Sequence, residues 1–158
     1  MPEPATTLAL AAGMGVIAGM RSLSAPALVS RRLSQRRRRG RGWPARLLGS
    51  GRVADALTLL AAGEMIADKL PAIPARTEAG PLTGRAMTGA LSGAAVAGWR
   101  GGSVVGGAVV GAAAALGAAV GAYRLRRAAG AYVPDPALAL VEDAVVLAAG
   151  SRIASAVA

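Results

Sequence analysis

Residues 101–123 read GGSVVGGAVVGAAAALGAAVGAY, a stretch of 23 residues without a single charge. At a helical rise of about 1.5 Å per residue, this stretch reaches about 35 Å, enough to cross the hydrocarbon core of a bilayer. Sixteen of its residues are Gly, Ala or Ser, the small side chains through which membrane helices pack closely. The stretch therefore predicts a membrane-spanning helix.

The composition of the whole chain agrees with this prediction. Hydrophobic residues make up 54% of the 158 residues, and the mean hydropathy of +0.48 is above that of a typical soluble domain. Aromatic residues are only 3% and Phe is absent, whereas a soluble core depends on aromatic and large aliphatic side chains. We therefore predict an all-α integral membrane protein, with one transmembrane helical domain over residues 1–158. The alternative is a soluble, Ala-rich helical bundle.

The residue types that are missing exclude several classes of function. Cys and His are both absent, which excludes thiolate and disulfide chemistry and removes the commonest general base and metal ligand. The sequence has no Gly-x-Ser-x-Gly motif and no phosphate-binding loop. With no catalytic constellation in view, we predict neither an enzyme nor a metal or cofactor site.

The charged residues indicate a location. Net charge is +10, and Lys69 is the single lysine among 18 basic residues. Arginine in place of lysine, with abundant Ala and Gly, is typical of a GC-rich bacterial genome. Residues 1–4 lack the positive region of a signal peptide, so we expect the first apolar segment to be retained. The expected localisation is the bacterial cytoplasmic (inner) membrane, with multiple passes.

Proline, glycine and charge divide the chain into about five predicted helices. The first begins near Thr6 or Thr7, and Pro26 breaks or kinks it near Ser24. This segment either ends at Arg21 or continues past it with one embedded Arg. The other expected helices cover residues 53–69, 85–99, 101–123 and 136–156. Because several of these are short or carry charges, four spans plus a re-entrant segment is an alternative.

The segment of residues 31–52 contains nine Arg and no acidic residue, together with Gly40, Gly42 and Pro44. We predict a cytoplasmic loop that attracts anionic lipid, with Trp43 at the lipid interface. The segment lacks the interleaved aromatic residues of nucleic-acid binding, so no nucleic-acid partner is expected.

The orientation of five alternating spans contains a conflict. If the arginine-rich loop is cytoplasmic, the N-terminus faces outward and so do Arg124, Arg126 and Arg127, against the positive-inside rule. Either one segment is re-entrant, or the stronger loop overrides the weaker one. A third alternative is an inverted repeat, because Gly15, Gly19 and Arg21 resemble Gly117, Gly121 and Arg124 in spacing.

Glycine pairs four residues apart recur along the chain. Such pairs form a flat groove on one helix face and allow another backbone to approach. We expect packing inside one protomer; the alternatives are a homo-oligomer interface or a pore-lining helix. The pairs are Gly15 and Gly19, Gly89 and Gly93, Gly102 and Gly106, Gly107 and Gly111, and Gly117 and Gly121.

Charged residues inside otherwise apolar helices suggest a functional site. A charge at the centre of a membrane helix costs about 2.5–3.5 kcal/mol on the insertion scale, so it persists only when paired, near an interface or facing water. Glu64 and Asp68 share a helix face, while Glu142 and Asp143 point in different directions. We predict Arg21 as the counter-charge of Glu64 or Glu142.

Two functions fit these charges. One is a transport-type or channel-type protein with an intramembrane polar site, and the other is a structural or scaffold protein whose buried charges are ion-pair staples. The candidate site comprises Arg21, Ser22, Glu64, Asp68, Lys69, Arg76, Glu142 and Asp143.

Three short stretches carry a family resemblance. They are AGMRS at residues 18–22, GEMIADKLP at residues 63–71 and VEDA at residues 141–144. Over residues 8–150 the chain resembles a bacterial family of small membrane proteins catalogued as domain of unknown function 4126. The resemblance implies a multi-pass membrane protein and brings no known substrate, cofactor or activity.

Overall fold

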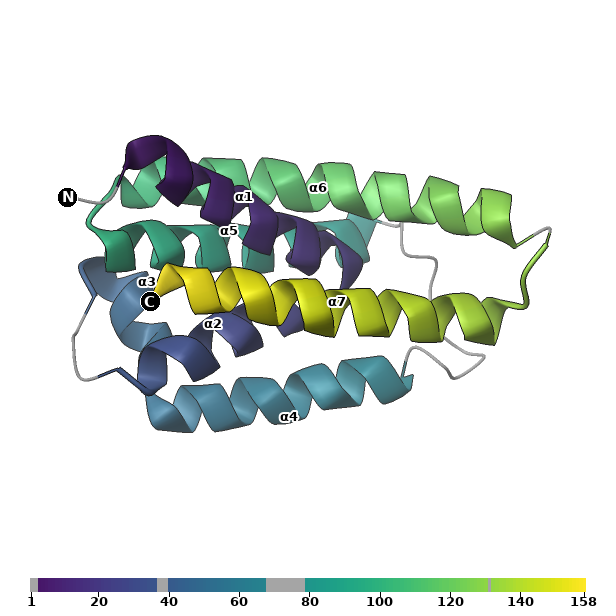
Figure 1. Ribbon diagram of the computed structural model, residues 1–158, viewed down its shortest axis with the longest axis horizontal. Coiled ribbons are helices and arrows are strands. Elements are labelled where there is room, and N and C mark those ends of the chain that lie inside the picture. Colours follow the sequence, from purple (N-terminus) through teal and green to yellow (C-terminus); the bar gives the residue numbers. More distant parts are fainter. Residues whose placement is uncertain (1–2, 37–39, 68–78, 131) are drawn as a thin grey trace.

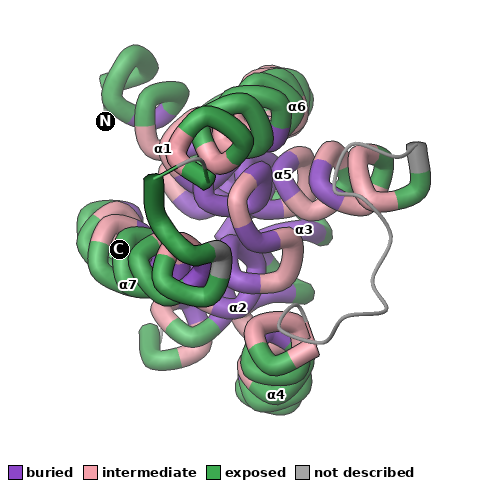
Figure 2. The backbone as a smooth tube through the Cα atoms, turned by 90° about the vertical axis from the view of Figure 1, so that its right-hand side faces the viewer, coloured by how far each residue is buried: buried purple, intermediate pink, exposed green. Residues whose placement is uncertain are grey.

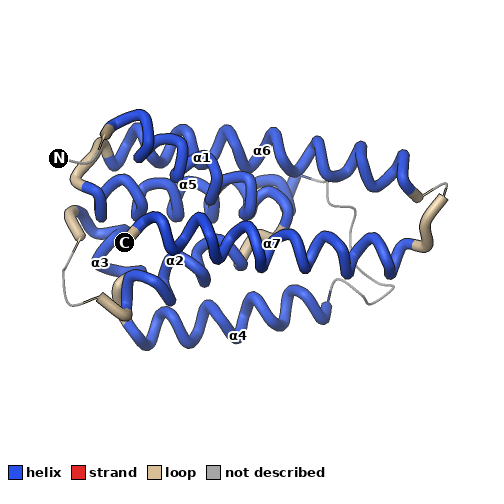
Figure 3. Tube along the Cα trace, viewed as in Figure 1, coloured by secondary structure: helices blue, strands red, loops and turns tan. Residues whose placement is uncertain are grey.

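The computed structural model describes residues 3–36, 40–67, 79–130 and 132–158. Over these residues the chain forms seven helices and no strand (Figures 1 and 3). The helices are α1 (Pro4–Met20), α2 (Ser24–Ser34), α3 (Gly42–Leu48), α4 (Gly51–Ala67), α5 (Ala79–Arg100), α6 (Val104–Ala129) and α7 (Asp135–Val157). The all-α prediction is confirmed, and the prediction of about five helices is wrong.

The arginine-rich segment is not the loop that its composition predicted. Helix α2 continues to Ser34 and α3 occupies Gly42–Leu48, with residues 37–39 outside the described part of the chain. Both helices bury apolar side chains, among them Leu33 and Leu48 at 1% exposure each. Pro44 is the third residue of α3, where its missing N–H removes no intrahelical hydrogen bond. Burial and this position outweigh the unfavourable local composition.

The predicted break near Ser24 is confirmed. Helix α1 ends at Met20, and Arg21 has an extended backbone whose N–H donates to the Ile17 carbonyl at 2.9 Å. Helix α2 then begins at Ser24, so that Pro26 lies in its first turn, as its geometry requires. The first apolar segment is therefore two helices.

These two helices form a hairpin that returns to the end where it began (Figure 1). The Arg100 guanidinium joins the start of α1 to the end of α7, because it donates to Thr7 Oγ1 and to the Ala156 carbonyl, both at 3.1 Å. Arg36, just beyond α2, donates to the Ala158 carbonyl at 2.7 Å. The expectation that the N-terminus lies opposite the arginine-rich segment is therefore wrong, because the chain turns back at the α1–α2 break.

Helices α5 and α6 approach each other backbone to backbone. A methyl group added at Gly93 would overlap the Gly107 carbonyl oxygen, and one added at Gly107 would overlap the Gly93 carbonyl oxygen. Gly89 and Gly111 face each other in the same way, with an added Gly89 methyl 2.6 Å from the Gly111 oxygen. These glycines thus pack inside one protomer, since any side chain here would push the helices apart.

Helix α1 packs on another side of α6. Methyl groups at Gly15 and Gly19 would overlap the carbonyl oxygens of Gly111 and Ala115. In contrast, added methyl groups at Gly117 and Gly121 would meet nothing within 4 Å. The prediction that this last pair mediates packing in the protomer is therefore wrong, and the two segments compared as an inverted repeat have different surroundings.

The buried residues lie where α1, α2 and α5 meet, whereas α4, α6 and α7 turn exposed faces outward (Figure 2). Among the described residues, one helix is long and apolar enough to cross a membrane, namely α6. It continues beyond the charge-free stretch to Ala129, with Arg126 and Arg127 in its last turn. Helix α1 is apolar but shorter.

The glycine contacts predict that a Gly→Ala substitution destabilises the fold at one position of α6 and stabilises it at another. Gly111→Ala places a methyl group against the α5 backbone, and we expect a loss of about 1–3 kcal/mol in the free energy of unfolding. Gly117→Ala, the matched control, adds a methyl group in open space and gains up to about 1 kcal/mol from helix propensity. Denaturant unfolding followed by circular dichroism measures both, and equal effects would contradict the packing.

Candidate functional site

The predicted polar residues do not form one cluster. Asp68, Lys69 and Arg76 lie outside the described residues. Arg21, Ser22, Glu64 and Asp143 gather around the α1–α2 break. Glu142 pairs elsewhere.

Arg21 lies in the α1–α2 break and forms an ion pair with Asp143 of α7. Its Nη2 is 2.7 Å from Asp143 Oδ1, and the two side chains are 1% and 12% exposed. Removing a guanidinium from water is costly unless a carboxylate lies in direct contact. The predicted counter-charge, Glu64 or Glu142, is therefore corrected to Asp143.

Glu64 of α4 binds the backbone of the same break. Its two carboxylate oxygens accept from the N–H groups of Ser22 and Leu23, each at 2.8 Å. These donors lie directly before α2, where the helix dipole favours a negative charge. Ser22 thus contributes its backbone N–H group to the cluster. The carboxylate satisfies donors that the interrupted helix leaves without partners.

Glu142 serves a different pair of helices. Its Oε2 lies 3.4 Å from Arg126 Nη1, which joins α7 to α6. Adjacent residues on a helix point about 100° apart, so Glu142 reaches α6 while Asp143 reaches the α1–α2 break. The sequence predicted the divergence of the two side chains but not their partners.

The break lies beside the middle of the longest helix. Gly19, two residues before Arg21, packs against Ala115 and Ala118. These residues lie near the centre of α6, which covers Val104–Ala129. The charges of the break are therefore placed at about half the length of the bundle.

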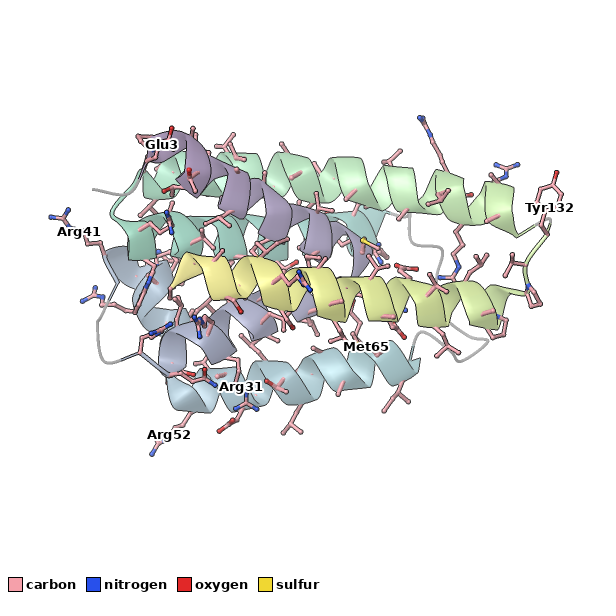
Figure 4. All side chains as sticks on the ribbon, in the orientation of Figure 1. Glu3, Arg31, Arg41, Arg52, Met65 and Tyr132 are labelled. Carbon is pink, nitrogen blue, oxygen red and sulfur yellow. The ribbon has the colours of Figure 1, made fainter. Side chains whose placement is uncertain are left out.

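A cavity of about 210 Å³ lies between α2, α4 and α7. Its walls are mostly apolar, with Leu28, Met65 and Leu147 among the lining residues. Ser24 lines it close to the break, and Arg31, labelled with Met65 in Figure 4, lies farther along α2. Arg31 forms an exposed ion pair with Asp55 at 2.9 Å.

The end of α7 shows an arginine arrangement that sequence reasoning missed. Arg32 donates to the carbonyl groups of Ser155 and Ala158, and Arg100 donates to Ala156. Cations are favoured at a helix C-terminus by the unpaired carbonyl groups there. Arginine density was visible in the sequence, but nothing in it linked α2 to the end of α7.

Comparison with family models, curated proteins and solved structures finds no match for this chain. The resemblance to domain of unknown function 4126 therefore stays a prediction, as do the role of the site and the membrane location.

The burial of the Arg21–Asp143 pair predicts that replacing Asp143 lowers the free energy of unfolding more than replacing its neighbour Glu142. Asp143→Asn leaves the guanidinium without this carboxylate, and we expect a loss of about 3–5 kcal/mol in the free energy of unfolding. Glu142→Gln, the control, should cost less, about 1 kcal/mol, because its partner Arg126 is 21% exposed and the contact is longer, at 3.4 Å. Denaturant unfolding measures both; a larger loss for Glu142→Gln would contradict the assignment.

Proposed function

We propose that this chain is a polytopic helical membrane protein of transport type, with its polar site at the α1–α2 break. The site consists of the Arg21–Asp143 ion pair and the Glu64 carboxylate on the α2 N-terminus. The observation that carries the proposal is the convergence of these charges from the break, α4 and α7 at about half the length of the bundle.

The outer surface supports a lipid environment. Large aliphatic side chains point away from the bundle on α4, α6 and α7, with Leu59 at 74% exposure, Val105 at 73% and Val141 at 61%. Apolar surface of this extent on several helices marks contact with lipid or protein. Helix α6 adds the length of a span.

The arrangement fits four spans and a re-entrant hairpin. Helices α6 and α7 run along most of the bundle, α4 and α5 extend part of the way from the end where α3 lies, and α1 and α2 enter and leave at that end (Figure 1). Arg41 and Arg52 lie at that end, Arg31 lies in the same half of the bundle, and Tyr132 lies at the other end (Figure 4). The positive-inside rule makes the arginine-rich end cytoplasmic, in a bacterial inner membrane. Arg126, at the opposite end, is neutralised by Glu142.

Interrupted helices with charges near the membrane midplane are the arrangement that many transporters use. Their half-helix N-termini hold anionic groups, and their binding sites lie between packed helices that can move. Here the N-terminus of α2 already holds the Glu64 carboxylate. The small-residue contacts of α6 leave smooth faces along which the neighbouring helices could shift.

The second candidate is a structural or scaffold membrane protein. One observation favours it: Glu64 and Asp143 both have partners within the chain, as ion-pair staples do. The two candidates differ in whether water reaches the break.

The hairpin predicts the sidedness of single-cysteine variants, which are straightforward because the chain has no Cys. A membrane-impermeant thiol reagent should label Thr6→Cys and Ser50→Cys from the same side of sealed vesicles. Tyr132→Cys should react from the opposite side. Labelling of Thr6→Cys and Ser50→Cys from opposite sides would contradict the re-entrant hairpin.

Water access to the break separates transport from scaffolding. For a transport site we expect the impermeant reagent to label Ser22→Cys from at least one side of the membrane. Ala113→Cys, on the exposed face of α6, should stay unlabelled in lipid, and Ser103→Cys at the end of the bundle should react fully. Ser22→Cys as unreactive as Ala113→Cys would favour the scaffold.

In the same vesicles, Glu64→Gln should abolish any ion flux that exceeds the flux of protein-free vesicles. Glu142→Gln, away from the break, should preserve this flux. An unchanged flux in Glu64→Gln would remove Glu64 from the mechanism.

A further inference from the structure

A second cavity lies on the outside of the bundle, away from the α1–α2 break. It has a volume of about 570 Å³ and runs between α5 and α6, with α3 at one end. Leu91, Ala94, Val105 and Val109 are among its lining residues. Among the described residues that line it, Thr88 and Trp43 have polar side-chain groups. The Thr88 hydroxyl donates to the Gly84 carbonyl of its own helix at 3.0 Å. The groove therefore offers an apolar surface and no free side-chain hydroxyl.

The α3 end of the groove has a different character. Trp43 lines the groove and is 63% exposed. Arg41 and Arg46 are exposed beside it in sequence, and neither forms an ion pair within the described part of the chain. The Arg41 N–H donates to the Gly98 carbonyl at 2.9 Å, which fixes α3 on α5. Figure 4 shows Arg41 extending outward from the end of the bundle.

We infer that this groove binds one acyl chain of an acidic phospholipid whose phosphate lies against Arg41 and Arg46. The inference rests on the proposed membrane location. Guanidinium groups bind phosphate through paired hydrogen bonds, and an exposed Trp is typical of the level of the headgroups. Residues 87–94 of α5 extend about 10 Å along the helix axis, so the groove holds the part of the chain nearest the headgroup.

The charges favour an acidic lipid over the other occupants of such a groove. A zwitterionic headgroup has no net charge and offsets neither arginine, whereas an acidic headgroup offsets one of the two positive charges. A second copy of the chain in the same membrane orientation, packed groove to groove across a twofold axis parallel to the helices, would bring Arg41 and Arg46 of both protomers together. Like charges at that distance oppose association. An acidic phospholipid instead supplies the apolar chain and the negative charge in one molecule.

Native mass spectrometry of the detergent-purified, delipidated full chain tests this site. Phosphatidylglycerol and phosphatidylcholine with identical acyl chains are the two probes. We expect one tightly bound phosphatidylglycerol per chain and a preference over phosphatidylcholine of about fivefold for each arginine. The double variant Arg41→Gln/Arg46→Gln should lose this preference, while Arg124→Gln, at the other end of the bundle, should keep it.

A second pair of variants tests the chain-binding groove. Ala108→Leu fills the groove and should weaken the binding of both lipids severalfold, whereas Ala113→Leu, on α6 but outside the groove, should not. No preference for phosphatidylglycerol, or equal effects of Arg41→Gln/Arg46→Gln and Arg124→Gln, would overturn the inference. Circular dichroism confirms that each variant is folded.

This outcome is independent of transport activity. Glu64→Gln should bind phosphatidylglycerol as the unmodified chain does, so a scaffold protein could still contain the lipid site. If the purified chain is monodisperse without detergent, the membrane location itself fails, and the lipid site fails with it.

Discussion

Two polar contacts hold the α1–α2 break in place. The Glu64 carboxylate accepts from the N–H groups of Ser22 and Leu23, and Arg21 forms an ion pair with Asp143. A helix interrupted inside a bundle exposes backbone donors, and Arg21 adds a positive charge that is 1% exposed. Neither can remain inside the bundle without partners. Helices α4 and α7 supply those partners, so their positions are coupled to the break. The remaining helices pack around a hairpin whose turn is already fixed.

The second constraint is that glycines, which have no side chain, line the contact between α5 and α6. Gly89, Gly93, Gly107 and Gly111 allow the two backbones to touch, and α1 approaches α6 through Gly15 and Gly19. Such contacts supply dispersion energy over a large area and have no side-chain entropy to lose. They suit a chain with little aromatic content. The two constraints act on different helices: polar contacts join α2, α4 and α7 to the break, and glycine contacts join α1, α5 and α6.

These two kinds of contact have different consequences for motion. A glycine interface is smooth, so helices can slide along it at low cost, whereas a buried ion pair has one favourable geometry. If Glu64 and Asp143 exchange their partners during a transport cycle, the break is a transport site. If they do not, its ion pair and hydrogen bonds are structural contacts. The outer groove adds a separate role for lipid, because α3 brings Trp43 to the end of this apolar groove beside Arg41 and Arg46, which form no ion pair with the described residues. That role depends on surface charge and not on the break.

The sequence by itself determined the all-helical class, the charge-free stretch of α6, the interruption that Pro26 imposes and most of the glycines that meet another helix. These features depend on local composition, on the missing N–H of proline and on the periodicity of one helix. Only the tertiary structure decided that Arg21 meets Asp143, that Glu64 binds backbone N–H groups and that Gly117 faces open space. It also turned more than half of the arginine-rich segment into helix and brought the N-terminus to the same end of the bundle. The physical reason is that these outcomes depend on which helices become neighbours, and neighbours more than 40 residues apart leave no pattern in a single sequence.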